Sequence, residues 1–191
     1  PFLGWRGMRI TLDHPDIFLV QVRAMLKAAN GLDNLRILVP MITTVFEAEE
    51  AMHLVHRAWM EVREEGVDVQ MPPVGVMIEV PAAVYQAREL AQRVDFLSVG
   101  SNDLTQLTLG LDRDSGVVAG LFDERDAAVR SLMAMAIRAC KRQGKYIGIC
   151  GQGPSDHPDL ARWLMAEGID SVSLNPDSVL ETWLFLAGQG K

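Results

Sequence analysis

Short apolar runs alternate with longer amphipathic segments along almost the whole length of this chain of 191 residues. Runs of roughly four to eight apolar residues between turn residues are typical of strands that are buried on both faces. The longer segments carry apolar residues at the spacing of a helix. Successive strands joined through helices must be parallel, because each crossover is long and right-handed. The pattern therefore predicts an α/β fold of about six βα units around one parallel sheet.

Turn and capping residues set the limits of the predicted elements. Pro15, Thr44 and Asn102 mark helix starts, and Gly31 and Gly66 mark helix ends. The predicted strands cover residues 2–10, 35–40, 75–79, 96–100, 146–150 and 169–174. The predicted helices cover residues 15–30, 44–66, 82–93, 126–143 and 158–166, and two more begin at 102 and 176.

Composition narrows the class of protein. Hydrophobic residues make up 49% and charged residues 23%, which is ordinary for one globular domain of this length. A net charge of −7 argues against a nucleic-acid or anionic-membrane partner. No apolar run is long enough to span a membrane, nothing resembles a signal peptide, and two cysteines do not make a disulfide framework. We therefore expect a cytoplasmic protein, and the start at Pro1 suggests a fragment of a longer chain.

Polar side chains follow the predicted strands at the points where the strands end. Glu79 ends one apolar run, Asn102 and Asp103 follow the next, and Cys150 ends a third. The carboxyl ends of parallel strands meet at one edge of a sheet, where α/β proteins build their sites. Glu79 and Asp103 are therefore expected to be neighbours that could share a cation.

The spread of these polar residues distinguishes between two parallel architectures. Periodicity alone allows either an open doubly wound sheet or part of a (β/α)8 barrel. Functional groups at the ends of several different strands suit a barrel mouth better than a single crevice. The barrel is therefore favoured, with about two units missing from a closed ring of eight. The residues at or just after predicted strand ends are Arg6, Glu79, Asn102, Asp103, Cys150 and Asn175.

Several motifs are long enough to point to a family. They are PFLGWRG, GVMIEVPAA, DFLSVGSNDLTQ, GLDRDSG and GICGQGPSDHPDLARWLMAEGIDSVSLNPD. Together they resemble the C-terminal barrel of the phosphoenolpyruvate-utilising enzymes, over essentially the whole chain. Residues 1–103 are most similar to enzyme I of the phosphotransferase system, in its nitrogen-regulatory form, and residues 98–191 to phosphoenolpyruvate synthase. The chain therefore resembles a recombinant of two relatives.

The resemblance implies a (β/α)8 TIM barrel of the phosphoenolpyruvate/pyruvate domain type that lacks its first two units. The phosphohistidine and nucleotide-binding domains of the family are absent from residues 1–191. In the family, this barrel moves a phosphoryl group between phosphoenolpyruvate and a histidine on a separate domain of the parent chain or on a carrier protein. Family members commonly dimerise through the barrel, so a homodimer is expected.

The resemblance also assigns roles to the polar residues. Glu79 and Asp103 would hold Mg²⁺, which takes few carboxylates and completes its octahedron with water and substrate oxygens. Arg6 and Arg113 would bind the phosphate, because a guanidinium matches its oxygens in a two-point geometry. Asn102 would contact a phosphate or carboxylate oxygen. The backbone N–H groups around Gly100 and Ser101 would help in that contact.

Cys150 would be the proton-transfer residue. Interconversion of pyruvate and its enolate requires a proton to move on and off carbon, which a thiol among backbone amides can do. Gln152 stands where enzyme I relatives carry a glutamate and the synthases a glutamine, which favours synthase chemistry.

Each assignment has an ordinary structural alternative. The two acids could be helix caps or members of surface salt bridges, and Cys150 could be a buried structural cysteine, as we interpret Cys140. Two other classes of protein also remain open at this point. One is a Mg²⁺-dependent lyase or aldolase acting on pyruvate, and the other is a non-catalytic truncated scaffold.

Overall fold

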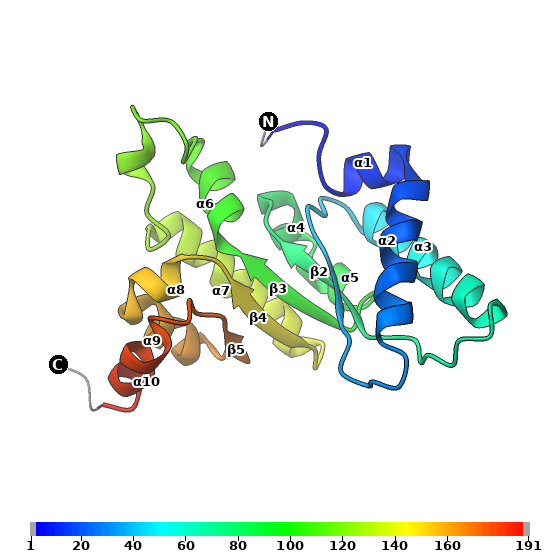
Figure 1. The fold of residues 1–191 in the computed structure, drawn as a ribbon. Coiled ribbons are helices and arrows are strands. Elements are labelled where there is room, and N and C mark those ends of the chain that lie inside the picture. The colour runs from blue at the N-terminus through cyan, green and yellow to red at the C-terminus, as the bar shows by residue number, and fades with distance from the viewer. Residues whose placement is uncertain (1–2, 189–191) are drawn as a thin grey trace.

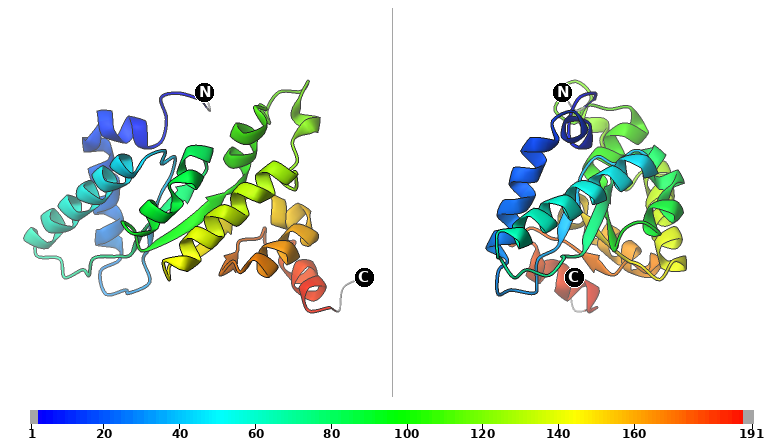
Figure 2. Two further views of the ribbon diagram at one scale, coloured as in Figure 1. Left: turned by 180° about the vertical axis from the view of Figure 1, so that it is seen from behind. Right: turned by 90° about the vertical axis from the view of Figure 1, so that its right-hand side faces the viewer.

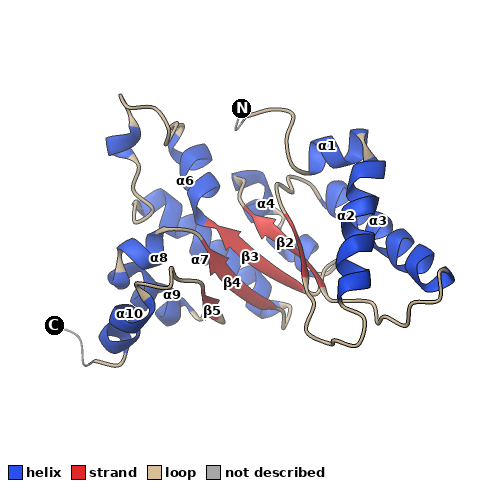
Figure 3. Ribbon diagram, in the orientation of Figure 1, coloured by secondary structure: helices blue, strands red, loops and turns tan. Residues whose placement is uncertain are grey.

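The computed structural model describes residues 3–188, and these contain a five-stranded sheet whose neighbouring strands are all parallel (Figure 1). The strands lie side by side in chain order from β1 to β5, and Figure 3 shows the helices around them. The predicted α/β class with a parallel sheet is confirmed. The strands are β1 Ile37–Val39, β2 Val74–Ile78, β3 Phe96–Gly100, β4 Tyr146–Cys150 and β5 Ser171–Val172.

Helices connect each strand to the next. Thr44 caps α3 as expected, because its side chain accepts from the Glu47 N–H while the Glu47 carboxylate accepts from the Thr44 N–H. The helices are α1 Met8–Asp13, α2 Pro15–Ala28, α3 Val45–Glu64, α4 Pro81–Tyr85, α5 Ala87–Ala91, α6 Ser101–Leu109, α7 Ala127–Arg142, α8 Gly153–Asp156, α9 Pro158–Glu167 and α10 Val179–Leu186. A short 3-10 helix, η1, spans Ala119–Leu121.

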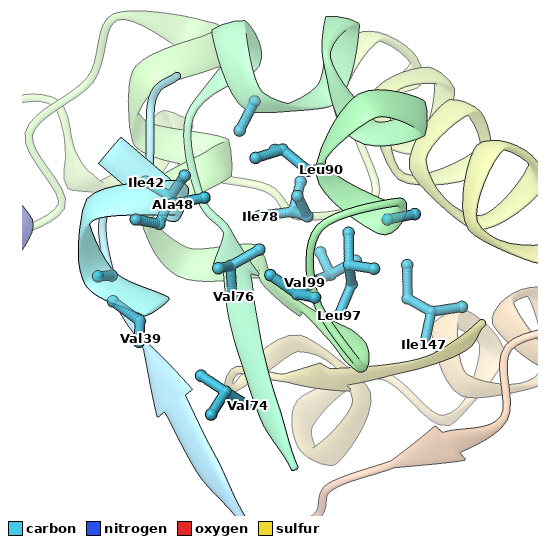
Figure 4. Close-up of a cluster of buried hydrophobic side chains, with 14 of the residues drawn as sticks. Val39, Ile42, Ala48, Val74, Val76, Ile78, Leu90, Leu97, Val99 and Ile147 are labelled. Atoms are coloured by element: carbon cyan, nitrogen blue, oxygen red, sulfur yellow. The ribbon is translucent and has the colours of Figure 1, made fainter. Parts of the chain in front are cut away.

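The two faces of the sheet have different chemistry, because successive side chains of a strand point to opposite sides. Val76, Ile78, Leu97, Val99 and Ile147 belong to one fully buried cluster, which Figure 4 shows together with side chains of the neighbouring helices. Figure 2 shows α7 lying along the rear of β3 and β4. Burial of each such side chain contributes about 1.5–3 kcal/mol.

The side chains on the opposite face of the sheet are smaller and more polar. Met77 and Ser98 are partners in the β2–β3 register, and Gly100 and Cys150 are partners in the β3–β4 register. Along each strand these positions alternate with the apolar ones, so their side chains share the face away from the buried cluster. Glu79 continues the same alternation one residue after β2 ends. The polar residues of several strands are thereby brought to one edge and one face.

The prediction of a strand over residues 2–10 is wrong for residues 3–10, which the structure describes. Gly4 and Gly7 have φ values of 102° and 55°, which break an extended backbone, and α1 begins at Met8. The Met8 side chain is buried in the core, so its apolar neighbours pack as one face of a helix. The described residues consequently contain five strands rather than about six, and Phe2 lies outside them.

Two predicted helices also differ in detail. The helix expected over residues 82–93 is divided between α4 and α5 at Gln86, whose side-chain amide donates to the carbonyls of Thr43 and Ala82. The last helix begins at Val179 rather than at 176, because a turn closed by Ser178 on the Asn175 carbonyl precedes it.

Within residues 3–188, no helix combines the length and the apolar character that crossing a membrane requires.

Candidate active site

The carboxyl ends of β2, β3 and β4 carry most of the predicted site residues. Glu79 follows β2, Ser101 to Asp103 begin α6 directly after β3, and Cys150 is the last residue of β4. Because the three strands are adjacent and parallel, their ends meet at one edge of the sheet (Figure 1). Asn175, also expected at the rim, is exposed and donates its N–H to Ser155 Oγ.

Glu79 is a buried acid whose proton affinity is strongly altered. Its side chain is 5% exposed, and Oε2 accepts from the backbone N–H of Met41 at 2.7 Å. The surroundings together raise the pKa of Glu79 to about 7: burial is the largest cause and the nearby Asp103 carboxyl acts in the same direction, while the Met41 N–H and Arg6 oppose the rise. The two acids are therefore close enough to interact directly.

The backbone of Met41 is specialised for this contact. Met41 has φ 55°, and within residues 3–188 no other non-glycine residue has a positive φ. Such a conformation costs free energy and persists only where surrounding structure imposes it. Gly7 lies directly against it, since a Cβ at Gly7 would be 2.7 Å from Met41 Cβ. The strained residue turns its N–H toward the Glu79 carboxylate.

Gly100 makes room for the same carboxyl group. A Cβ at this position would lie 2.5 Å from Glu79 Cγ and 2.9 Å from Oε1, which is closer than real contacts allow. The absence of a side chain at the end of β3 is therefore what lets Glu79 cross toward Asp103.

Asp103 is paired with Arg6 although no strand positions Arg6. Asp103 is a buried residue whose side chain is 11% exposed, and both of its oxygens accept from the Arg6 guanidinium, at 3.4 and 3.3 Å. Gln106 Nε2 lies 3.5 Å from Asp103 Oδ1, one turn further along α6. The loop before α1 thus brings the predicted phosphate-binding arginine to a predicted metal ligand.

Cys150 lies beside these groups and holds a protonated thiol. Its Sγ is 3.2 Å from Ser98 Oγ and 3.6 Å from the Val99 carbonyl oxygen. Burial raises the pKa of the Cys150 thiol, Ser98 partly offsets the rise, and the field of Glu79 adds to it. The sulfur is therefore close enough to Glu79 for their charges to interact.

Asn102 and Arg113 border a separate hollow next to this edge. Asn102 Oδ1 accepts from the Gln152 N–H at 3.1 Å, which ties α6 to the segment after β4. The exposed Arg113 donates its backbone N–H to Gln106 Oε1 at 2.8 Å. The hollow has a volume of about 340 Å³, and its lining includes Asn102, Arg113, Phe122, Glu124, Gln152 and His157.

Three residues of the region were not predicted. Ser98 looked like an ordinary strand residue, and nothing in the sequence marks Met41 as strained. Glu124 is buried, although the highly charged run DERD that contains it is typical of an exposed loop. The register pairs Ser98 with Gly148 rather than with Cys150, so the Ser98–Cys150 contact could not have been derived from strand pairing alone.

The donor set suits a hard cation. Within residues 3–188, no cluster of three or more His, Cys, Asp or Glu side chains could hold a metal ion. Glu79 and Asp103 offer carboxylate oxygens only, which match Mg²⁺ with most positions left for water and substrate. The Met41 N–H orients the Glu79 carboxylate by a hydrogen bond, and Arg6 orients that of Asp103. Carboxylates that bind metals are commonly held by such hydrogen bonds.

Comparison with known proteins identifies relatives along the whole chain. The family model "PEP-utilising enzyme, PEP-binding domain" matches residues 1–189. A phosphoenolpyruvate synthase from Pseudomonas aeruginosa is 54% identical over 191 residues, covering 98% of this chain and 24% of that protein. A protein of Escherichia coli named phosphoenolpyruvate-dependent phosphotransferase system is 45% identical over 180 residues, covering 94% of this chain and 24% of that protein. The chain thus spans about a quarter of these relatives.

Solved structures share the fold at low sequence identity. A citrate lyase from Burkholderia xenovorans superposes with a TM-score of 0.64 at 24% identity, over 90% of this chain and 53% of that one. A malate synthase from Haloferax volcanii superposes with a TM-score of 0.61 at 17% identity, over 90% of this chain and 48% of that one.

Proposed function

Because the chain belongs to the PEP-utilising enzymes, through their PEP-binding domain, we propose that it binds phosphoenolpyruvate and pyruvate in a phosphotransferase most like phosphoenolpyruvate synthase. The reaction transfers a phosphoryl group between a phosphohistidine and pyruvate. The observation that carries the proposal is the meeting of Glu79, Asp103, Arg6 and Cys150 at one edge of the sheet. This phosphoryl transfer requires a cation site, an anion-binding group and a proton donor close together.

We assign the Mg²⁺ site of the enzyme to Glu79 and Asp103. When bound there, Mg²⁺ would supply positive charge next to the enolate and phosphate oxygens. Glu79 and Asp103 would hold it through their carboxylates, and the buried setting of both residues strengthens their attraction to a cation.

The arginines and Asn102 bind and orient the anion in this proposal. Arg6 already presents two guanidinium N–H groups to a pair of oxygens, and a phosphate offers the same geometry as the Asp103 carboxylate. Arg113 and Asn102 line the adjoining hollow and would contact the anion from there. The N–H groups at Gly100 and Ser101 would assist at the start of α6. Both arginines keep their positive charge in a closed site.

Cys150 is assigned to proton transfer at carbon. In the direction of pyruvate formation, the S–H bond breaks and its proton joins the methylene carbon of the enolate, which leaves a thiolate. In the reverse direction the thiolate removes a methyl proton from pyruvate. The protonated resting state of Cys150 suits the first step, and Ser98 can stabilise the thiolate by a hydrogen bond.

The surroundings of the domain are part of the proposal. We infer that further βα units close the sheet into a (β/α)8 barrel, since β1 and β5 are the outer strands of the described sheet. The phosphohistidine lies on another domain of the parent chain or on a carrier protein, and two copies associate through the barrel. Free thiols at Cys140 and Cys150 suit a reducing cytoplasm.

A second candidate reaction is that of enzyme I, phosphoenolpyruvate-protein phosphotransferase. It is favoured by the relative that is 45% identical, and it uses the same barrel chemistry with a carrier protein as the eventual acceptor. Two assays distinguish the reactions. Phosphoryl transfer to a carrier protein would favour enzyme I, and phosphoryl transfer coupled to a nucleotide would favour the synthase.

Proton exchange into labelled pyruvate tests the assignment. The wild-type chain should exchange the methyl protons in the presence of Mg²⁺, and Cys150→Ala should abolish the exchange while phosphoenolpyruvate binding persists. Calorimetry with phosphoenolpyruvate, with and without Mg²⁺, supplies the binding measurement. Exchange that is unchanged in Cys150→Ala would remove the proposal in favour of a lyase or aldolase, and binding without any Mg²⁺ dependence would favour a scaffold.

A further inference from the structure

Glu124 is a buried acid that the proposed reaction does not use. It lies between η1 and α7, and its side chain is 5% exposed. Its sequence neighbours Asp123 and Arg125 are well exposed and form an ion pair with each other. Glu124 Oε1, in contrast, has no hydrogen-bond partner within residues 3–188. Burying a carboxyl group with an unused oxygen is costly, so a role beyond filling space is indicated.

The carboxyl group lies directly against the segment that leaves β4. A Cβ at Gly153 would lie 2.5 Å from Glu124 Oε2 and 2.9 Å from Oε1, so the carboxyl group touches the Gly153 backbone. Gly153 stands three residues after Cys150, with Gly151 and Gln152 between them. Glu124 therefore packs against the short segment that directly follows Cys150.

Ser101 reaches the same segment from α6. Its hydroxyl is fully buried and, like Glu124 Oε1, has no hydrogen-bond partner among the described residues. A Cβ at Gly151 would lie 1.9 Å from Ser101 Oγ, so the two backbones could not approach with a larger residue there. The Ser101 hydroxyl is near enough to oppose the rise in the pKa of Glu124 that burial causes, although no hydrogen bond of normal geometry joins them.

These contacts make one junction between the two segments that carry the predicted site. The start of α6 supplies Ser101 and Asn102, and the segment after β4 supplies Gly151 and Gly153, with the Asn102–Gln152 hydrogen bond alongside. The Glu124 carboxyl group contacts Gly153 in the segment after β4 and interacts with Ser101 at the start of α6. Glu124 Oε1 and Ser101 Oγ are both buried without a hydrogen-bond partner among the described residues, so a hydrogen bond between them would satisfy both.

We propose that Glu124 is a positioning residue, which holds the Gly151–Gly153 segment against the start of α6 and thereby sets where the Cys150 thiol lies relative to Asn102 and Asp103. It acts through hydrogen bonding to Ser101 and contact with Gly153. Its effect on catalysis rests on the proposed function, whereas its effect on the placement of the thiol does not.

Two substitutions at position 124 separate hydrogen bonding from packing. Glu124→Leu keeps a similar volume but cannot hydrogen-bond, and Glu124→Gln keeps both the shape and the hydrogen-bonding groups. Glu89→Leu is the matched control, because Glu89 is exposed on α5 and lies outside the lining of the hollow. Two measurements on the whole chain are compared, namely the alkylation rate of Cys150 by iodoacetamide and proton exchange into labelled pyruvate.

The expected pattern is specific. Glu124→Leu should slow proton exchange by about 10- to 100-fold with KM within about threefold, because misplacing a reacting group by a fraction of an ångström costs rate. The same variant should change the alkylation rate of Cys150, and Cys140 does not interfere because it is buried. Glu124→Gln and Glu89→Leu should retain wild-type values of both.

Two results would overturn the inference. One is wild-type alkylation and exchange in a folded Glu124→Leu, and the other is a Glu124→Gln variant as impaired as Glu124→Leu. If Glu124→Leu does not fold, Ser101→Ala decides, since it removes only the hydroxyl and should alter Cys150 alkylation. A wild-type rate in Ser101→Ala would then be the overturning result. Absence of exchange in the wild type would count against the proposed function, and alkylation would still test Glu124.

Discussion

Arg6 and Asp103 are 97 positions apart in the sequence, yet their side chains form a two-point ion pair, with N–O distances of 3.4 and 3.3 Å. In the proposed function, the first of these side chains binds phosphate and the second binds Mg²⁺. Each therefore occupies the binding atoms of the other before a ligand arrives. A phosphate that takes Arg6 leaves the Asp103 oxygens available to the cation, so the two ligands should assist each other.

The first prediction is that Mg²⁺ and phosphoenolpyruvate bind cooperatively. Asp103→Asn should weaken Mg²⁺-dependent binding by about 10- to 100-fold, because it removes one of the two anionic ligands. Titration calorimetry of phosphoenolpyruvate at several Mg²⁺ concentrations measures the coupling, with the exposed Asp177→Asn as control. Equal affinities with and without Mg²⁺ in the wild type would contradict the prediction.

The second prediction concerns the pH dependence of stability. Glu79 has a pKa of about 7 in the folded chain against 4.5 as the ordinary value, so the folded state binds more protons than the unfolded state between these pH values. The free energy of unfolding should therefore fall as the pH rises through this range, by at most about 3 kcal/mol from this group.

Glu79→Gln is the variant that isolates this contribution, since it is neutral at every pH. Urea unfolding of both proteins between pH 5 and pH 8, without Mg²⁺, should show the wild type losing stability relative to Glu79→Gln as the pH rises. Parallel pH curves for the two proteins would show that Glu79 does not titrate as described.

The third prediction concerns the glycine at the end of β3. Gly100→Ala would place a Cβ 2.5 Å from Glu79 Cγ, so either the backbone or the acid must move. We expect a loss of about 1–3 kcal/mol in stability together with weaker Mg²⁺ binding. Gly120→Ala is the control, because a Cβ there meets nothing within 4 Å. Thermal unfolding and Mg²⁺ titration are the measurements, and wild-type Mg²⁺ affinity in Gly100→Ala would contradict the described geometry.

The fourth prediction distinguishes the two thiols. Burial raises the pKa of Cys140 to about 12, and its side chain is fully enclosed, so it should resist alkylation until the chain unfolds. Cys150 is half-buried, and its pKa is raised as well, so it should react slowly at neutral pH and faster as the pH increases. Mass spectrometry of alkylated peptides measures both rates, and faster labelling of Cys140 than of Cys150 in native protein would refute this placement.

Local sequence patterns account for the strands and for the acids at their ends. β3 and β4 coincide with the predicted ranges, because an apolar run bounded by charged or glycine-rich turns depends on neighbouring residues only. The Thr44 cap was found for the same reason. Glu79 and Asp103 could be proposed as neighbours, since parallel strands end at one edge of the sheet.

Contacts between distant residues decided the rest. The N-terminal segment looked like a strand, but two glycines with positive φ and the burial of Met8 make it a turn and a helix. The left-handed Met41 likewise depends on packing against Gly7, which a sequence window does not contain.

The sequence by itself therefore determined the order of the five described strands and the residue types at their ends, because periodicity and capping act over a few neighbouring residues. Tertiary structure alone decided that Arg6 pairs with Asp103, that Glu79 acquires a pKa of about 7, and that Glu124 is buried. The reason is physical, since burial and charge interactions depend on which distant side chains exclude water from one another.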